Sequence, residues 1–352
     1  MRFPKQPAGG YLAAAFAMRP ELPASLFGAE ELARLRAVAK LDELDVITDF
    51  RTAGLRLLAG LEVLVTGWGA PVIGTAELDL MPRLRAVIHA GGTVKGHVLP
   101  EVWERGILVT TAADANARPV AEFTLAAILL AGKDVAALAA GYARDPAFSA
   151  SGYAAAAGYS GARGIGNYGR IVGIVGASRI GRRVIDLLGQ FDFRVLVHDP
   201  HLAADDPLPR HAERTGLADL FTRSSIVSIH APLLPETTGL VGSRLLALMR
   251  PGAVLINTAR GAIVDHDALA EAVHAGGLRA ILDVTEPEPL PADHPLRGLP
   301  GVILTPHVAG SLGNEIRRLG ESATREVELL AAGQPPMYPV GEESLITMAL
   351  TA

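Results

Sequence analysis

The stretch "VGIVGASRIGRRV", residues 172–184, joins a short apolar run to a glycine turn and the start of a helix. It follows a G-x-G-x-x-G spacing at Gly176, Ser178 and Gly181, with serine in place of the middle glycine. In this pattern the first glycine permits a tight turn, the second lets the backbone approach a pyrophosphate, and the third lets helix pack on strand. Ser178 is small, and its hydroxyl can itself donate to a phosphate. The stretch therefore predicts a dinucleotide-binding β-α unit.

An acidic residue ends the next apolar run, "VLVHDP". Asp199 stands twenty-three residues after Gly176, where a carboxylate can accept from both ribose hydroxyls of NAD and repel a 2′-phosphate. The alternative, in which Asp199 only begins a turn with Pro200, is weaker beside the glycine pattern. We interpret the flanking His198 and His201 as surface residues and assign no metal site.

Two series of short apolar runs alternate with helical segments along the chain. The first series is "LAAAFAM", "LDVIT", "LEVLVTG", "LRAVIHA" and "GILVTT"; the second is "RIVGIV", "FRVLVHD", "SIVSIHAP", "GAVLINTA", "LRAILDV" and "GVILTPH". Strands separated by single helices pair in parallel, with crossovers on the faces of the sheet. We therefore expect an α/β protein with two doubly wound parallel-sheet domains.

The segments between and after the two series set the expected domain boundaries. Residues 119–135 are apolar almost all round, which predicts a long helix enclosed by protein. Residues 141–169 are rich in Gly, Ala, Ser and Tyr without periodicity, and we expect a connecting arm there that can reach another subunit. Asp265 is the expected N-cap of a helix over 265–274. We expect a substrate domain of residues 1–118 and 308–352 and a coenzyme domain of residues 119–307.

Bulk composition excludes several classes of protein. A chain of 352 residues exceeds the usual limit for one core, and 49% apolar with 20% charged residues describes a globular protein. The net charge of −5 and the lack of a basic run argue against a nucleic-acid partner. With no cysteine, disulfides and thiolate chemistry are excluded. We read the apolar run 11–18 as a core strand rather than a signal, find no stretch that predicts a membrane span, and expect a cytoplasmic protein.

Polar residues or glycine follow six of the apolar runs. In an open parallel sheet, ligands bind outside the carboxyl ends of the strands, so six such residues in register define a site. They are Gly176, Asp199, His230, Arg260, Asp283 and His307.

The chain contains the motifs "VGIVGASRIG", "SIHAPLLPETTGLVG", "LINTARGAIVDHDAL", "LDVTEPEPLPADHPL", "ILTPHVAGS" and, from Asn116, "NARPVAEFTLAAILL". Through this ordered set it resembles the D-isomer-specific 2-hydroxyacid dehydrogenase family, and the resemblance covers essentially its whole length. It implies a Rossmann NAD-binding domain inserted into a flavodoxin-like substrate domain, and a homodimer. It also implies an NAD-dependent oxidoreductase that interconverts a small 2-oxo acid and its D-2-hydroxy acid.

The resemblance also implies roles for single residues. Arg260 matches the arginine that binds the substrate carboxylate, for which its planar fork is suited. His307 matches the acid/base, and its carboxylate partner lies five residues after Asp283, which is Glu288 and not Glu286. Asp283 would lie near the nicotinamide carboxamide. The expected coenzyme contacts are Gly176, Ser178, Arg179, Ile180, Gly181, Asp199, His230, Ala231, Thr258, Ala259, Asp283, His307 and Gly310.

The substrate loop departs from the family pattern. A motif of the type G-x-G-x-D aligns with "AGGTVKG", residues 90–96, with Thr93 in place of the second glycine and Lys95 in place of the aspartate. Gly91, Gly92, Thr93 and Lys95 are the expected substrate contacts beside Arg260. Lys95 indicates either a more anionic substrate or an exposed lysine, and the sequence leaves both open.

Other functions compete within the same fold. A formate dehydrogenase would carry glutamine as the partner of the histidine, which Glu288 disfavours. A phosphite-oxidising relative and a non-catalytic NAD-sensing scaffold, as in corepressor relatives, remain as alternatives.

Overall fold

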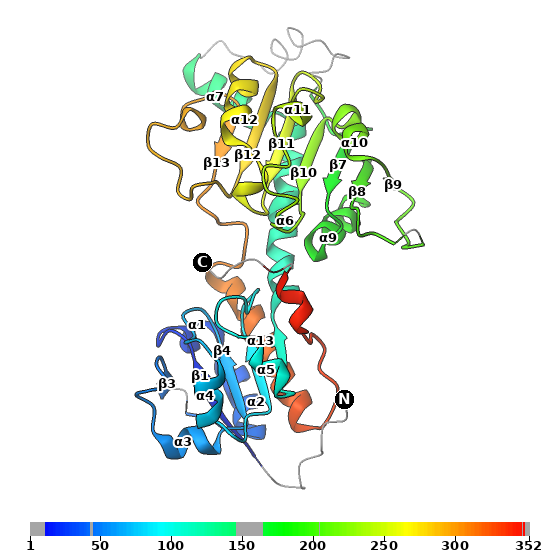
Figure 1. Cartoon of the computed structure of the whole chain (residues 1–352). Coiled ribbons are helices and arrows are strands. Elements are labelled where there is room, and N and C mark those ends of the chain that lie inside the picture. Colours follow the sequence, from blue (N-terminus) through cyan, green and yellow to red (C-terminus); the bar gives the residue numbers. More distant parts are fainter. Residues whose placement is uncertain (1–10, 43–44, 146–164, 204, 347, 349–352) are drawn as a thin grey trace. The chain divides into compact units, whose positions relative to one another are not determined.

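The computed structural model describes residues 11–42, 45–145, 165–203, 205–346 and 348. The chain divides into two compact units, unit 1 (Met1–Asn116 and Ser311–Ala352) and unit 2 (Ala117–Gly310). Each unit has its own parallel sheet with helices beside it (Figure 1). Unit 2 lies within the sequence of unit 1, and the expected fold class of two doubly wound α/β domains is confirmed.

Unit 1 is built on a sheet with the strand order β2-β1-β4-β5-β6, and β3 also pairs with β1. Every pairing among these strands is parallel. The elements are β1 (Leu12–Ala17), α1 (Leu22–Leu26), α2 (Ala29–Val38), β2 (Ala39–Lys40), β3 (Val46–Ile47), α3 (Leu55–Gly60), β4 (Val63–Thr66), α4 (Thr75–Leu80), β5 (Ala86–His89), α5 (Glu101–Glu104), β6 (Leu108–Thr111), η3 (Gly313–Ile316), α13 (Arg317–Ala331) and η4 (Glu342–Ile346).

The sheet of unit 1 is buried on both faces, as a parallel sheet requires. Leu12 and Phe16 of β1 belong to one apolar cluster, which α13 and α2 cover, whereas Ala15 and Ala17 belong to a second cluster. Successive side chains of a strand point to opposite faces, so β1 contributes to both cores. Residues after Ser311 complete unit 1, and Pro339 forms an antiparallel bridge with Thr110.

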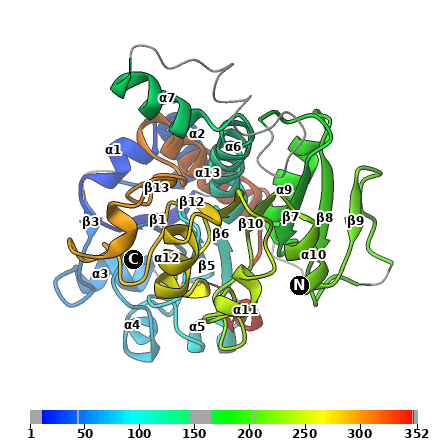
Figure 2. The same ribbon diagram turned by 90° about the horizontal axis from the view of Figure 1, so that it is seen from above.

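Unit 2 contains a seven-stranded parallel sheet in the order β13-β12-β11-β10-β7-β8-β9 (Figures 1 and 2). Its elements are α7 (Val135–Arg144), β7 (Ile171–Val175), α9 (Arg179–Leu188), β8 (Arg194–His198), β9 (Ala212–Arg214), α10 (Leu217–Arg223), β10 (Ile226–Ile229), α11 (Ser243–Leu246), β11 (Ala253–Asn257), η1 (Gly261–Ile263), α12 (His266–His274), β12 (Leu278–Leu282), η2 (Pro295–Arg297) and β13 (Val302–Leu304). Alternate residues of the central strands pack into two separate apolar clusters. Asp265 caps α12 as expected, because its Oδ1 accepts from Ala268 N at 3.0 Å.

Two sequence-based boundaries were wrong. The helix expected over 119–135 is α6 (Ala113–Gly132), which begins six residues earlier and contains Pro119. Since Pro119 lacks an N–H, it fits the first turn best, and that preference led to the late start. The helix is also not enclosed all round, since Leu130 is 52% exposed. The expected arm begins as the last turn of α7, and its residues 146–164 lie outside the described part of the chain.

The structure also bears on membrane and metal sites. Among the described residues, no single helix has the length and apolar character of a membrane span, although α6 and α7 together, bent by 57°, pass that test. Over the same residues, no three His, Asp or Glu side chains are grouped so that they could hold a metal ion.

Candidate functional site

The carboxyl ends of six strands of unit 2 lie in register. Val175 pairs with His198 and with Ile229, Ile229 pairs with Asn257, Asn257 with Leu282, and Leu282 with Leu304. Each of these residues ends its strand. The chain continues from them into Gly176, Asp199, His230, Arg260, Asp283 and His307. The structure thus brings all six predicted positions to one edge of one sheet.

The glycine turn after β7 requires its two glycines. Gly176 has φ +95°, and a Cβ there would lie 2.6 Å from the backbone nitrogen of Ala231. A Cβ on Gly181 would lie 2.1 Å from the carbonyl oxygen of Gly176. Ser178 is the N-cap of α9, and its Oγ accepts from Gly181 N at 3.3 Å. The hydroxyl therefore serves the helix as acceptor while it can still donate outward.

This turn fits the pyrophosphate of a dinucleotide. Arg179 and Ile180 are the first residues of α9, a helix of ten residues, and the first N–H groups of a helix have no partner within it. Those N–H groups together with the helix dipole favour an anion. The exposed side chain of Arg179 adds a positive charge at the same end.

Asp199 lies beside the glycine turn and is fixed there by backbone donors. Its Oδ2 accepts from Ala177 N at 2.7 Å, and its Oδ1 accepts from His201 N at 2.8 Å. Each carboxylate oxygen can accept a second hydrogen bond. The side chain is therefore oriented and still able to accept from ribose hydroxyls.

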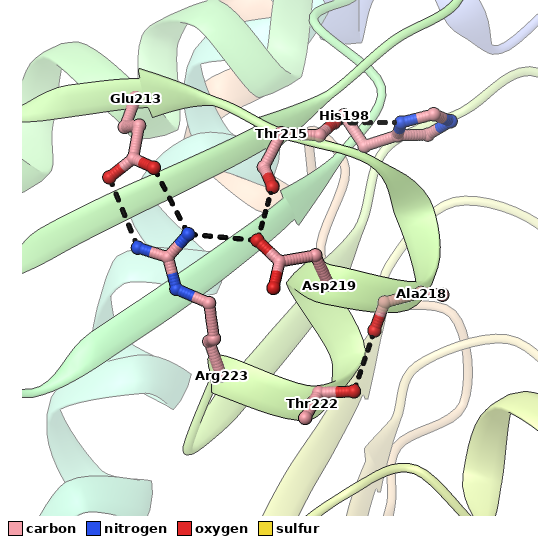
Figure 3. Close-up of polar contacts among 7 residues, drawn as sticks. All are labelled: His198, Glu213, Thr215, Ala218, Asp219, Thr222 and Arg223. Atoms are coloured by element: carbon pink, nitrogen blue, oxygen red, sulfur yellow. Dashed lines mark hydrogen bonds and ion pairs between the residues drawn. The ribbon is translucent and has the colours of Figure 1, made fainter.

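A polar cluster on β9 and α10 supports the strand end that carries Asp199 (Figure 3). The imidazole of His198 bonds through Nδ1 to the carbonyl oxygen of Thr215 at 3.1 Å. Thr215 Oγ1 donates to Asp219 at 2.6 Å, and Arg223 bridges Asp219 and Glu213. These ion pairs are exposed and contribute little to stability. The cluster thus holds the imidazole of His198 through Nδ1.

His230 follows β10 and is buried and neutral. Its Nε2 contacts Ser228 Oγ at 2.9 Å, and burial lowers the pKa of the imidazole to about 3. Its Nδ1 is buried without a hydrogen-bond partner in the described structure. The backbone of Ala231 lies against Gly176, so His230 and Ala231 both pack beneath the glycine turn.

The turn that carries Arg260 is held by Asn257, the last residue of β11. Asn257 is fully buried; its Oδ1 accepts from Ala259 N at 3.0 Å and its Nδ2 donates to the carbonyl oxygen of Arg260 at 2.9 Å. Burial lowers the pKa of Arg260, whereas the nearby charge of Glu288 raises it. The hydroxyl of the buried Thr258 contacts Thr124 of α6 at 3.0 Å.

The structure places His307 against Glu288. Nδ1 of His307 lies 2.8 Å from Glu288 Oε1, and both side chains are partly exposed, at 43% and 40%. His307 has φ +54°, a left-handed conformation that few residues other than glycine adopt. Glu286 is exposed. The count of five residues from Asp283 therefore selects the glutamate that contacts the histidine.

Asp283 follows β12 and is almost fully buried. Its Oδ1 accepts from Thr305 Oγ1 at 2.6 Å and from Val308 N at 2.8 Å, while Oδ2 accepts from Ala309 N at 2.9 Å. The carboxylate is thus bonded to the segment around His307. Gly310 follows that segment as the last residue of unit 2.

In unit 1, the loop of residues 90–96 continues from β5. A Cβ on Gly91 would lie 2.4 Å from Nε2 of His89, so the backbone of the loop rests directly on this imidazole. The carbonyl oxygen of Gly91 accepts from Ala112 N at 2.9 Å. Lys95 N donates to Thr93 Oγ1 at 3.2 Å, and both side chains are half-buried.

Two buried histidines support this loop. His89 Nδ1 contacts Thr66 Oγ1 at 2.9 Å, and its ring lies 4.7 Å from that of His97, centre to centre. Burial, together with the other imidazole, holds the pKa of His89 well below its usual value, and burial lowers the pKa of His97 to about 4. The ring under the loop and the ring packed against it are therefore neutral at neutral pH.

Sequence reasoning missed four supporting residues: Asn257, Thr305, His89 and His97. A signal existed for Asn257, since asparagine commonly accepts from the N–H two residues on and starts a turn. Thr305 and the two histidines gave no local signal, because their contacts depend on strand pairing and loop packing.

Comparison with known proteins shows which family the chain resembles. Residues 145–309 match the family model "D-isomer specific 2-hydroxyacid dehydrogenase, NAD binding domain". D-3-phosphoglycerate dehydrogenase from Mycobacterium bovis is 33% identical over 266 residues, covering 75% of this chain and 48% of the relative. The chain thus spans about half the length of that relative.

Other relatives match over most of their length. Glyoxylate reductase from Thermofilum pendens is 34% identical over 276 residues, covering 78% of this chain and 79% of the relative. The crystal structure of a phosphoglycerate oxidoreductase from Rhizobium etli superposes with a TM-score of 0.78 at 26% identity, covering 96% of this chain and all of that one. NAD is the coenzyme of the matched domain, and the chain belongs to the D-isomer-specific 2-hydroxyacid dehydrogenase family.

Proposed function

We propose that the chain is an NAD-dependent dehydrogenase that interconverts a small 2-oxo acid and its D-2-hydroxy acid. The observation that carries the proposal is the 2.8 Å contact between His307 and Glu288 on the sheet edge that also carries Arg260. Family membership and the glycine turn support the coenzyme. When bound, NADH supplies the hydride that reduces the carbonyl carbon.

The residues of unit 2 then have distinct tasks. Arg260 binds the substrate carboxylate through two parallel hydrogen bonds, which its planar fork can donate. His307, held through Nδ1 by Glu288, gives a proton from Nε2 to the carbonyl oxygen as the alcohol forms, and takes it back in the reverse direction. The carboxylate of Glu288 stabilises the imidazolium and orients the ring.

Unit 1 is proposed to supply the remaining substrate contacts. Backbone N–H groups of the loop from Gly91 to Val94 are suited to a carboxylate, and Lys95 is suited to a second anionic group. Relatives are named for D-3-phosphoglycerate and for (S)-sulfolactate, whose names include such a group. We therefore propose that the substrate class extends to oxo acids with two negative charges.

A panel of 2-oxo acids tests the function. Purified protein is mixed with singly and doubly charged oxo acids and either NADH or NADPH, and the loss of reduced-nicotinamide absorbance is followed. We expect turnover of at least one acid, with NADH preferred because Asp199 repels a 2′-phosphate. Binding of NADH without turnover of any acid would indicate a coenzyme-sensing scaffold, and preference for NADPH would remove the role given to Asp199.

We also propose a homodimer. None of the residues of α7 is buried, although the helix is largely apolar. Within unit 2, α7 borders an apolar groove of about 320 Å³ to which Leu130, Val135 and Ile303 contribute. Exposed apolar surface of this kind favours association. Light scattering should give the mass of two chains, and replacing Leu130 and Val135 with Asp should give the mass of one.

A further inference from the structure

The buried carboxylate of Asp283 accepts its hydrogen bonds from a single segment of the chain. It accepts from Thr305 Oγ1, Val308 N and Ala309 N, which lie on both sides of His307. The backbone carbonyl of Asp283 also accepts from His307 N, at 2.9 Å. Asp283 therefore accepts four hydrogen bonds, one from His307 itself and three from residues on both sides of it.

The backbone of His307 needs such support. A non-glycine residue with φ +54° is strained, and strain of this kind persists only where the surroundings over-determine it. The adjacent Val308 N and Ala309 N are both bonded to the same carboxylate, so the chain cannot relax at His307 without breaking a charge-assisted bond. A shift there would carry the imidazole away from Glu288.

The burial of Asp283 also indicates that its carboxylate supports the segment around His307. Asp283 is 1% exposed, and burying a carboxylate destabilises the fold unless its oxygens are hydrogen-bonded. Within the described structure it forms no ion pair, and one O–H and two N–H donors compensate its charge. A carboxylate whose main task was to contact the nicotinamide would not need three donors from one protein segment.

We propose that Asp283 and Thr305 are positioning residues, which hold His307 in its left-handed conformation and so keep its ring on Glu288. The hydroxyl of Thr305 is the side-chain part of this clamp, at 2.6 Å from the carboxylate. The proposal rests on the proposed function, in which His307 is the acid/base. It changes the expected role of Asp283 from a coenzyme contact to the anchor of the catalytic turn.

Thr305→Val tests the clamp without removing the buried charge. It keeps the branched shape but loses the donor, so the turn should loosen. We expect kcat for oxo-acid reduction to fall about tenfold, with the Kd of NADH unchanged within twofold. The midpoint of the pH–rate profile should move to lower pH, because the ring spends less time on Glu288. Thr305→Ser restores the donor and should recover most of kcat.

The matched control is Thr222→Val, which removes an equivalent hydroxyl bond, to Ala218 on α10 (Figure 3). It should leave kcat and the pH profile unchanged. A raised Kd of NADH at constant kcat would assign Asp283 and Thr305 to the coenzyme and overturn the clamp. So would a Thr305→Ser variant as impaired as Thr305→Val, or a Thr305→Val variant as active as the unmodified protein.

Asp283→Asn is a second variant, since it turns one acceptor into a donor that faces a backbone N–H. Where this variant does not fold, Thr305→Val still decides the question. The imidazole signals of His307, assigned by comparison with His307→Gln, give a readout that does not require activity. If the unmodified protein reduces no oxo acid, the proposed function fails, whereas a changed His307 signal in Thr305→Val still supports the clamp and an unchanged signal overturns it.

Discussion

In unit 2 the turns that carry Arg260 and His307 are held by hydrogen bonds from the buried side chains of Asn257 and Asp283. In unit 1 the loop of residues 90–96 rests instead on the uncharged ring of His89, which packs against the ring of His97. Hydrogen bonds fix the direction in which a side chain leaves the backbone, as a directed proton or carboxylate contact requires. Packing against a ring fixes only the path of the backbone. The first kind of support should therefore be sensitive to single polar atoms and the second to single methyl groups.

Arg260→Lys should give the largest loss. The charge remains, but an ammonium group cannot donate two parallel bonds to a carboxylate. We expect kcat/KM for the oxo acid to fall about a thousandfold, equivalent to about 4 kcal/mol, with NADH binding preserved. The same change at the exposed Arg250, which bonds Thr222 O, is the control. Normal turnover by Arg260→Lys would show that Arg260 has only a structural role. It would also contradict the distinction drawn between the supports in the two units.

Acid should destabilise unit 1 through its buried imidazoles. In the unfolded chain His97 takes up a proton near pH 6.5, but in the folded chain only near pH 4. Its contribution is therefore complete above pH 6.5 and is lost as pH falls toward 4, by about 3 kcal/mol for this one residue. Both tryptophans, Trp68 and Trp103, lie in unit 1, so their fluorescence during urea unfolding reports on this unit.

His97→Phe provides the comparison for that measurement. Phenylalanine keeps an aromatic ring beside His89 and removes one titrating group. The free energy of unfolding should then depend less steeply on pH between 6.5 and 4 than in the unmodified protein. Equal slopes would show that folding does not lower the pKa of His97, and the ring packed against His89 would then not be neutral.

Gly91→Ala tests the packing of the substrate loop. Its Cβ would meet His89 Nε2 at 2.4 Å, so the loop must shift. We expect KM for the oxo acid to rise about tenfold, while the Kd of NADH stays constant. Gly92→Ala is the matched variant, since the nearest atom to its Cβ would be at 3.5 Å, and its loss should be much smaller. An equal rise in KM in the two variants would show that the effect does not come from the contact with His89.

Lys95→Ala should have the smallest effect. If Lys95 contacts a second anionic group, kcat/KM for doubly charged oxo acids should fall several-fold, equivalent to about 1 kcal/mol. Acids that resemble pyruvate should be affected less. Equal effects on both classes, or none, would show that Lys95 does not contact the substrate.

The sequence allowed the fold and the strand-end residues of unit 2 to be predicted, because glycine turns and apolar runs are local patterns. Gly176, Asp199 and Glu288 could be located by counting along the chain. Asp283 was recognised as a site residue, but its bonds to Thr305 and Ala309 depend on the pairing of β12 with β13 and leave no local trace. The start of α6 was misplaced because a proline in the second turn looks like a helix start.

The substrate side was harder to predict for a physical reason. The loop of residues 90–96 departs from the family pattern, and its shape depends on His89 and His97, two side chains that sequence reasoning did not connect with it. A histidine at the end of a strand, as His89 is in β5, is read first as a core residue, which gives no link to the loop beside it. Only the structure places the ring of His89 under Gly91.

The central claim, that His307 and Glu288 act as an acid/base pair, is tested most directly by the pH dependence of two matched variants. Glu288→Gln keeps the shape and removes the negative charge that stabilises the imidazolium. Glu286→Gln makes the same change two residues away, on an exposed side chain without a contact to His307 among the described interactions.

Reduction needs the protonated imidazole, so its rate falls as pH rises through the midpoint of the profile. We predict that Glu288→Gln moves this midpoint to lower pH. Reduction should then fail at neutral pH and partly recover in mild acid, with NADH binding little changed. Glu286→Gln should leave the profile where it is. A shift in Glu286→Gln and none in Glu288→Gln would contradict the account.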